Sequence, residues 1–202
     1  MTRRNNAKVA GFAFLVYIAV ALTGIIMSNR ASSGEGTAAK LANIAQHVPQ
    51  MRVAFVLEML GCVCALVLGV TLYAITRDAD GDLALLGMTF RVAEGVIGAV
   101  SLPEMLKSLW LATTTGAHAP SPAAVDAVAA YLLKVPHRSL GATFFAFGST
   151  IFAYLLLRGR IVPVALAWLG VLGSILIVVL LPLELVGVVG RPITDVMWLP
   201  ML

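Results

Sequence analysis

The chain has 202 residues, 60% of them hydrophobic and 12% charged. Its mean hydropathy of +0.96 excludes an ordinary soluble domain. Runs of about 20 apolar residues, the length that crosses a hydrocarbon core of roughly 30 Å, recur along the sequence. The formal net charge of +4 does not indicate a nucleic-acid partner, because the basic residues lie at the ends of apolar runs and form no single patch. The composition predicts an all-α polytopic transmembrane helical bundle forming a single domain over residues 1–202.

Five apolar stretches are long enough to be full spans. We expect these spans at 8–28, 52–76, 83–107, 136–157 and 161–183. The first is too long for a signal peptide and no A-x-A cleavage site follows it. The C-terminal sequence RPITDVMWLPML begins like a sixth helix and stops after a few residues. We expect it to be a short segment that is either truncated or lies at the membrane interface.

Each of the two long connections contains the signal of an additional helix. Near 37–48, apolar residues recur on one helical face. Near 121–134, Ser121 followed by Pro122 is typical of a helix start and precedes a second apolar stripe. Both segments are predicted to be amphipathic helices on the outer surface, serving either as a lid or as connectors.

Small residues at a spacing of four predict close helix packing. The second span has this pattern at Gly61, Ala65 and Gly69, and the fifth span repeats it at Gly170 and Ser174. Small side chains at this spacing allow helix backbones to approach closely in lipid. We interpret all five as packing residues.

The distribution of basic residues predicts the orientation. The N-terminal Arg3, Arg4 and Lys8 and the basic turn at 158–160 are the densest basic segments. Because basic segments remain on the cytoplasmic side, a cytoplasmic N-terminus is favoured. The two long connections then lie outside.

Ionisable residues within the second and third spans are the strongest functional signal. Glu94 lies roughly 18 Å from the inner end of its span if that span begins at Asp82. Glu58 lies about 9 Å below the outer surface, at a similar level. Arg91 and Glu94 are three residues apart and share a helical face. We therefore predict that Arg91 pairs with Glu94, with Glu58, or with both.

The energy of burying these charges leaves two interpretations. Each costs about 2.5–3.5 kcal/mol in a bilayer unless it is paired or hydrated. The cluster is either a structural clasp between helices or the floor of an outward-facing cavity. The residues that would line the floor and mouth of such a cavity are Glu58, Arg91, Glu94, Ser101, Glu104, His137 and Arg138. The sequence contains no Glu-x-x-His motif and no paired histidines, so we expect no metal and no cofactor.

Four segments resemble a known family. They are RNNAKVAGFAFLVYIAVALTGI, LGVTLYAITR, LALLGMTFRVAEG and FFAFGSTIFAYLLLRGRIVPVALAWLGVLG. Together they resemble a bacterial membrane-protein family catalogued as domain of unknown function 4386. The chain departs from that family at its end, where the family continues through a full last helix. The resemblance implies a multi-pass protein of the bacterial inner membrane and brings no assigned activity.

Three functional hypotheses follow. The first is binding of a small amphipathic or lipid-like ligand in the outward-facing cavity, with Arg91 holding an anionic group. The second is a structural or accessory membrane subunit in which the charges only fix helix packing. The third is a membrane-embedded acid–base enzyme that uses Glu58, Glu94 or His137. The expected partner is the lipid bilayer, and the sequence leaves a homo-oligomer open.

Overall fold

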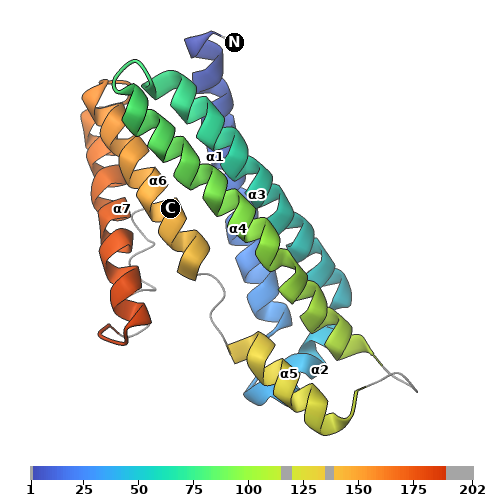
Figure 1. The fold of residues 1–202 in the computed structure, drawn as a ribbon. Helices are drawn as coiled ribbons and strands as arrows, with labels where there is room; N and C mark the ends of the chain where they lie inside the picture. Colours follow the sequence, from blue (N-terminus) through green and yellow to red (C-terminus); the bar gives the residue numbers. More distant parts are fainter. Residues whose placement is uncertain (1, 115–119, 135–138, 190–202) are drawn as a thin grey trace. The chain divides into compact units, whose positions relative to one another are not determined.

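The computed structural model describes residues 2–114, 120–134 and 139–189. Its described residues form helices and no strands. The helices are α1 (Arg3–Ala31), α2 (Gly36–Gln46), α3 (Val48–Thr76), α4 (Gly81–Thr113), α5 (Pro122–Lys134), α6 (Ser139–Arg158) and α7 (Val164–Leu185) (Figure 1). The predicted C-terminal sixth segment lies outside the described residues.

Five of these helices, α1, α3, α4, α6 and α7, are long and apolar enough to cross a membrane. Large apolar side chains of these helices are exposed, among them Phe12, Val100 and Leu166. Exposing such side chains to water is unfavourable, whereas exposing them to lipid is not. The predicted all-α polytopic bundle with five spans is confirmed.

Three spanning helices, α1, α3 and α4, are longer than the spans predicted for them. The third span, predicted at 83–107, is part of a 33-residue helix that continues to Thr113. At 1.5 Å per residue this helix is about 50 Å long, whereas the hydrocarbon core is roughly 30 Å thick. Charged residues at 104 and 107 marked the end of the predicted span, so the continuation of the helix from residue 108 to Thr113 was not predicted. Pro103 lies inside α4 without ending it.

The helices form two compact units. Unit 1 comprises residues 1–18, 62–97 and 138–202, and unit 2 comprises residues 19–61 and 98–137. The prediction of a single domain stays a prediction.

The core of unit 1 is formed by apolar side chains between successive helices. Ala146, Ile177 and Leu181 join α6 to α7. Ala84, Phe152 and Leu155 join α4 to α6. At Gly170 of α7, an added Cβ would lie 3.2 Å from the Cβ of Ala153 on α6, so this glycine allows close approach. Ser174, one turn further on, is fully buried, and its hydroxyl donates to the carbonyl oxygen of Gly170.

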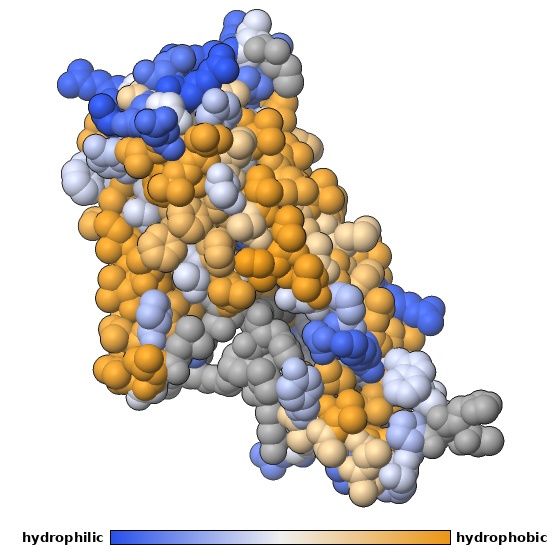
Figure 2. Space-filling model, in the orientation of Figure 1, coloured by the Kyte–Doolittle hydropathy of each residue, from blue (hydrophilic) through white to orange (hydrophobic). Residues whose placement is uncertain are grey.

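One end of unit 1 is polar. It contains the start of α1, the turn between α3 and α4, and the turn between α6 and α7 (Figure 1). Arg158 Nη1 lies 2.8 Å from Asp80 Oδ2, which joins the two turns. Asp80 Oδ1 also accepts a hydrogen bond from the Leu83 N–H at 3.1 Å and so caps the first turn of α4. In Figure 2 hydrophilic residues gather at this end above an apolar surface.

Unit 2 contains the two shorter helices, α2 and α5. Leu41 of α2 packs with Leu111 of α4 and with Ala129 and Leu132 of α5. A second cluster joins Ile44 of α2 to the end of α1 and the start of α3. Helices are therefore present at both predicted positions, and each uses its apolar stripe to pack within the unit.

Candidate functional site

A buried ionic cluster lies within unit 1. Arg91 Nη1 and Glu94 Oε2, both on α4, are 2.7 Å apart. The Tyr17 hydroxyl of α1 donates to the other carboxylate oxygen, Oε1, at 2.6 Å. Arg91 is only 3% exposed and Glu94 only 8%. The cluster therefore binds α4 to α1 through contacts shielded from both lipid and water.

Two aromatic rings face the guanidinium group. Arg91 Cζ lies 5.1 Å from the ring centroid of Tyr17 and 5.1 Å from that of Phe145 on α6. The two rings are stacked, with centroids 6.2 Å apart and planes inclined by 12°. A cation over an aromatic face is attracted by the ring quadrupole, most strongly where water is excluded. The Arg91 charge is thus stabilised by one carboxylate and two rings.

Two glycines make room for the aliphatic part of Arg91. A Cβ added at Gly69 of α3 would lie 3.1 Å from Arg91 Cβ. One added at Gly148 of α6 would lie 3.1 Å from Arg91 Cδ. Such distances are tight for any side chain, so both helices depend on glycine where they pass the arginine. Together with α1, they surround Arg91 with three neighbouring helices.

The two charges of the cluster are paired with each other, although two of its buried atoms make no hydrogen bond within the described part of the chain. Arg91 Nε is buried without a hydrogen-bond partner among the described residues, and Glu94 Oε2 makes no directional hydrogen bond beyond its ion pair. The charges of Arg91 and Glu94 cancel. The predicted Arg91–Glu94 pair is therefore present, and it forms a closed, neutral contact.

Glu58 belongs to unit 2 and is half-buried on α3. A Cβ added at Gly24 of α1 would lie 3.9 Å from Glu58 Oε2. Gly61 also faces α1, since its nearest neighbour is Val20 at 3.9 Å. The pairing of Glu58 with Arg91 stays a prediction.

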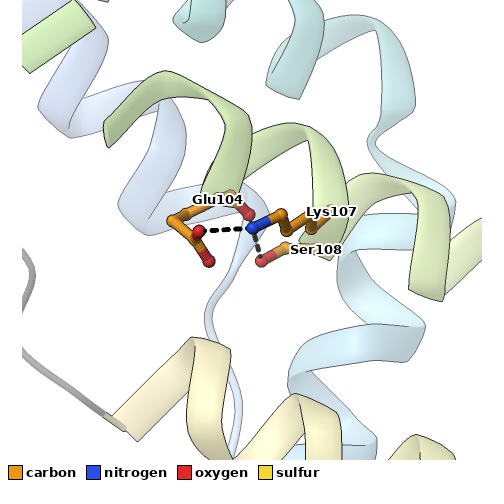
Figure 3. Close-up of polar contacts among 3 residues, drawn as sticks. All are labelled: Glu104, Lys107 and Ser108. Atoms are coloured by element: carbon orange, nitrogen blue, oxygen red, sulfur yellow. Dashed lines mark hydrogen bonds and ion pairs between the residues drawn. The ribbon is translucent and has the colours of Figure 1, made fainter. Parts of the chain in front are cut away.

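A second ion pair of α4 lies in unit 2. Lys107 Nζ donates to Glu104 Oε1 at 2.6 Å, and the Ser108 hydroxyl donates to the Glu104 carbonyl oxygen at 3.0 Å (Figure 3). The Lys107 side chain is 59% exposed and that of Glu104 is 28% exposed. Glu104 Oε2 is nevertheless buried and has no hydrogen-bond partner among the described residues. The Lys107 end of this pair is therefore accessible, whereas the oxygen without a partner is buried.

The Glu104–Lys107 pair lines a cavity between α4 and α5. The cavity has a volume of about 340 Å³. Its walls combine one ion pair with aromatic and aliphatic side chains, namely Glu104, Lys107, Trp110, Leu111, Val128, Tyr131 and Leu132. We call this space the α4–α5 groove. One polar end and apolar walls match the surface of an amphipathic molecule.

The remaining predicted residues have different outcomes. Ser101 is half-buried on α4 and belongs to unit 2. His137 and Arg138 lie outside the described residues. Among the described residues, no group of three His, Cys, Asp or Glu side chains is arranged to hold a metal ion.

A family model matches residues 9–202, almost the whole chain. The chain belongs to DUF4386, described as a domain of unknown function. This confirms the family expected from the four sequence segments. No curated protein and no solved structure matches the chain.

For this DUF4386 protein, sequence reasoning missed three members of the buried cluster: Tyr17, Phe145 and Gly148. The depth of Tyr17 along its helix could have indicated its contact with Glu94. Counted along their helices, Tyr17 lies about 21 Å from Arg3 and Glu94 about 20 Å from Gly81, so the two polar groups have matching levels. Phe145 and Gly148 carry no comparable signal, because aromatic and small residues are common throughout apolar spans.

Proposed function

We propose that this DUF4386 protein binds a single amphipathic, lipid-like molecule in the α4–α5 groove. The observation that carries this proposal is the Glu104–Lys107 pair at the polar end of an otherwise apolar groove. The ligand position therefore differs from the one expected over Arg91, because both Arg91 and Glu94 have their main partners within the protein.

The ion-pair end of the groove lies at the level of lipid headgroups. Glu104 lies about 35 Å along the helix from Gly81, and a hydrocarbon core is roughly 30 Å thick. With Gly81 at one boundary of the core, Glu104 lies just beyond the other. Trp110 and Leu111 lie about 9–10 Å further along α4, so a lipid-like molecule whose headgroup meets the ion pair would place its chain outside the core, against these apolar walls.

The chemistry of the pair favours a zwitterionic headgroup. The Lys107 ammonium has three donors and gives one to Glu104, so it retains donors for a phosphate. The Glu104 Oε1 atom, which accepts from Lys107, can accept a further hydrogen bond from an ammonium or hydroxyl group. A volume of about 340 Å³ lies at the lower end of the range for small-molecule sites and accommodates a headgroup with part of one chain.

Filling the groove tests this proposal. Val128→Trp places a large side chain in the groove, whereas Val100→Trp puts the same change on an exposed site of α4 that does not line it. We expect Val128→Trp to weaken binding of lysophosphatidylethanolamine to the purified protein at least tenfold and Val100→Trp to leave it unchanged. Equal binding by both variants would refute the proposed site.

A second role, a structural one, is favoured by the buried cluster. Arg91, Glu94 and Tyr17 join α4 to α1 in a closed contact, which supports a clasp that fixes helix packing. Both roles are compatible in one molecule. The acid–base alternative stays a hypothesis, since His137 lies outside the described residues.

We also propose that the protein lies in the bacterial inner membrane with its N-terminus in the cytoplasm. The basic start of α1 and the 158–160 turn lie at the same end of unit 1, which supports a common side (Figure 1). A reporter fused after Arg158 should be cytoplasmic. A periplasmic readout would reverse the orientation and place the α4–α5 groove on the cytoplasmic side.

A further inference from the structure

The polar end of unit 1 is rich in exposed basic residues that neither the buried cluster nor the groove uses. We call this set the basic rim. It comprises Arg3, Arg4, Lys8, Arg77, Arg158 and Arg160, all of them exposed. The rim is drawn from three separate segments: the start of α1 and the two turns that Asp80 and Arg158 join. The fold therefore gathers charges that the sequence separates by more than 150 residues.

The rim remains positive after its own acids are counted. The same segments contain Asp78, Asp80 and Asp82, so six basic and three acidic residues leave a net charge of +3. Asp80 is engaged by Arg158 and by the helix cap. Five basic residues are left against two exposed acids, Asp78 and Asp82.

The end of helix α6 positions Arg160 within the rim. Arg160 has φ of 48°, in the left-handed region that glycine and asparagine adopt more readily. The Arg160 N–H donates to the Leu157 carbonyl oxygen at 3.1 Å and the Ile161 N–H donates to that of Leu156 at 3.0 Å, so this conformation caps the C-terminus of α6. The cap fixes the backbone position from which the Arg160 side chain joins the rim.

We propose that the basic rim binds the phosphate groups of anionic membrane lipids. The rim lies at the ends of spanning helices, which is the level of lipid headgroups. Guanidinium groups present planar pairs of donors that suit phosphate oxygens. Lys8, about 8 Å further along α1 than Arg3, reaches the same level by extending its aliphatic stem toward the headgroups. The rim thus recruits several anionic lipids around one end of unit 1.

This inference is independent of the α4–α5 groove and is tested with the full chain. The protein is reconstituted into phosphatidylcholine nanodiscs that carry spin-labelled phosphatidylglycerol or spin-labelled phosphatidylcholine. The fraction of motionally restricted lipid gives the preference for the anionic headgroup. Nanodiscs expose both faces, so any effect of charge on insertion direction does not enter the measurement.

The test variant combines Arg4→Gln, Arg77→Gln and Arg160→Gln, one change in each segment of the rim. The matched control combines Arg30→Gln, Lys40→Gln and Arg52→Gln, which removes the same charge from unit 2. A basic residue near an anionic surface contributes a factor of about five in affinity. We expect the wild-type preference for phosphatidylglycerol to fall at least threefold in the test variant and to persist in the control.

High salt tests the electrostatic origin of the lipid preference in the wild-type protein. In 1 M salt the screening length falls to about 3 Å, so the wild-type preference should largely disappear. An unchanged preference in the test variant, or an equal loss in the control, would refute the basic rim as the binding surface. Binding of heparin without any preference for phosphatidylglycerol would instead identify an acidic macromolecule as the partner and would overturn the proposal.

Discussion

Helix α4 carries two ion pairs, Arg91–Glu94 and Glu104–Lys107. In both pairs the residues are three positions apart, but the first pair is buried and the second is partly exposed. In the first pair the side chains are 4% and 10% exposed, and the Tyr17 hydroxyl donates a hydrogen bond to the second oxygen of the Glu94 carboxylate. In the second pair Lys107 is 59% exposed and one oxygen of Glu104 has no hydrogen-bond partner. Spacing within a helix thus predicts that two residues pair. Their neighbours on other helices determine whether the pair is closed and holds the fold together or remains exposed.

The largest expected effect comes from breaking the closed pair. Arg91→Met should lower the free energy of unfolding by about 3–5 kcal/mol, because Glu94 would be left buried without a counter-charge. The matched change Lys107→Met should cost no more than about 1 kcal/mol, since an exposed pair contributes little. Denaturation of the purified variants in detergent measures both.

A double variant separates charge from packing in this comparison. Arg91→Met combined with Glu94→Gln should recover much of the lost stability, because no uncompensated charge remains. Wild-type stability of Arg91→Met alone would show that the buried pair does not stabilise the fold.

A smaller effect is expected from crowding the closed pair. Gly148→Ala puts a methyl group 3.1 Å from Arg91 Cδ, and displacing the arginine should cost about 1–3 kcal/mol. Gly11→Ala is the control, because nothing lies within 4 Å of its added Cβ. Thermal unfolding in detergent should show a lower midpoint for the first variant and an equal or higher midpoint for the second. A tolerated Gly148→Ala would mean that the Arg91 site is looser than the contacts indicate.

The smallest effect concerns the partly exposed pair Asp80–Arg158. The hydrogen bond from the Leu83 N–H, followed by the Arg158 charge, lowers the pKa of Asp80. A lowered pKa stabilises the fold above the unfolded-state value of about 3.9, and this contribution is lost as pH falls through the lower folded-state value. The melting temperature of the wild type should therefore fall more between pH 5 and pH 3 than that of Asp80→Asn. Asp78→Asn is the neighbouring control and should follow the wild type.

The fold was predictable because apolar length dictates membrane spans, and each of the five is present. The Arg91–Glu94 pair was predictable because three residues bring two side chains to one helical face. The partners from other helices were harder to predict. Tyr17 is 77 residues from Glu94 in sequence, and its contact depends on how α1 packs against α4. The α4–α5 groove was not predicted, because it depends on α4 continuing past its apolar run to Trp110 and Leu111, beside α5.

The contact between Tyr17 and Glu94 has a consequence for biosynthesis. The segment α4 has the lowest mean hydropathy of the five spans. Arg91 and Glu94 would add roughly 5–7 kcal/mol to its transfer from the translocon into lipid if it entered alone. Tyr17 on α1 and Gly69 on α3 are synthesised before α4. The hydroxyl that binds Glu94 and the helix surface that packs against Arg91 are therefore already present when α4 leaves the ribosome. We therefore expect α4 to enter the bilayer efficiently only when the first two spans precede it.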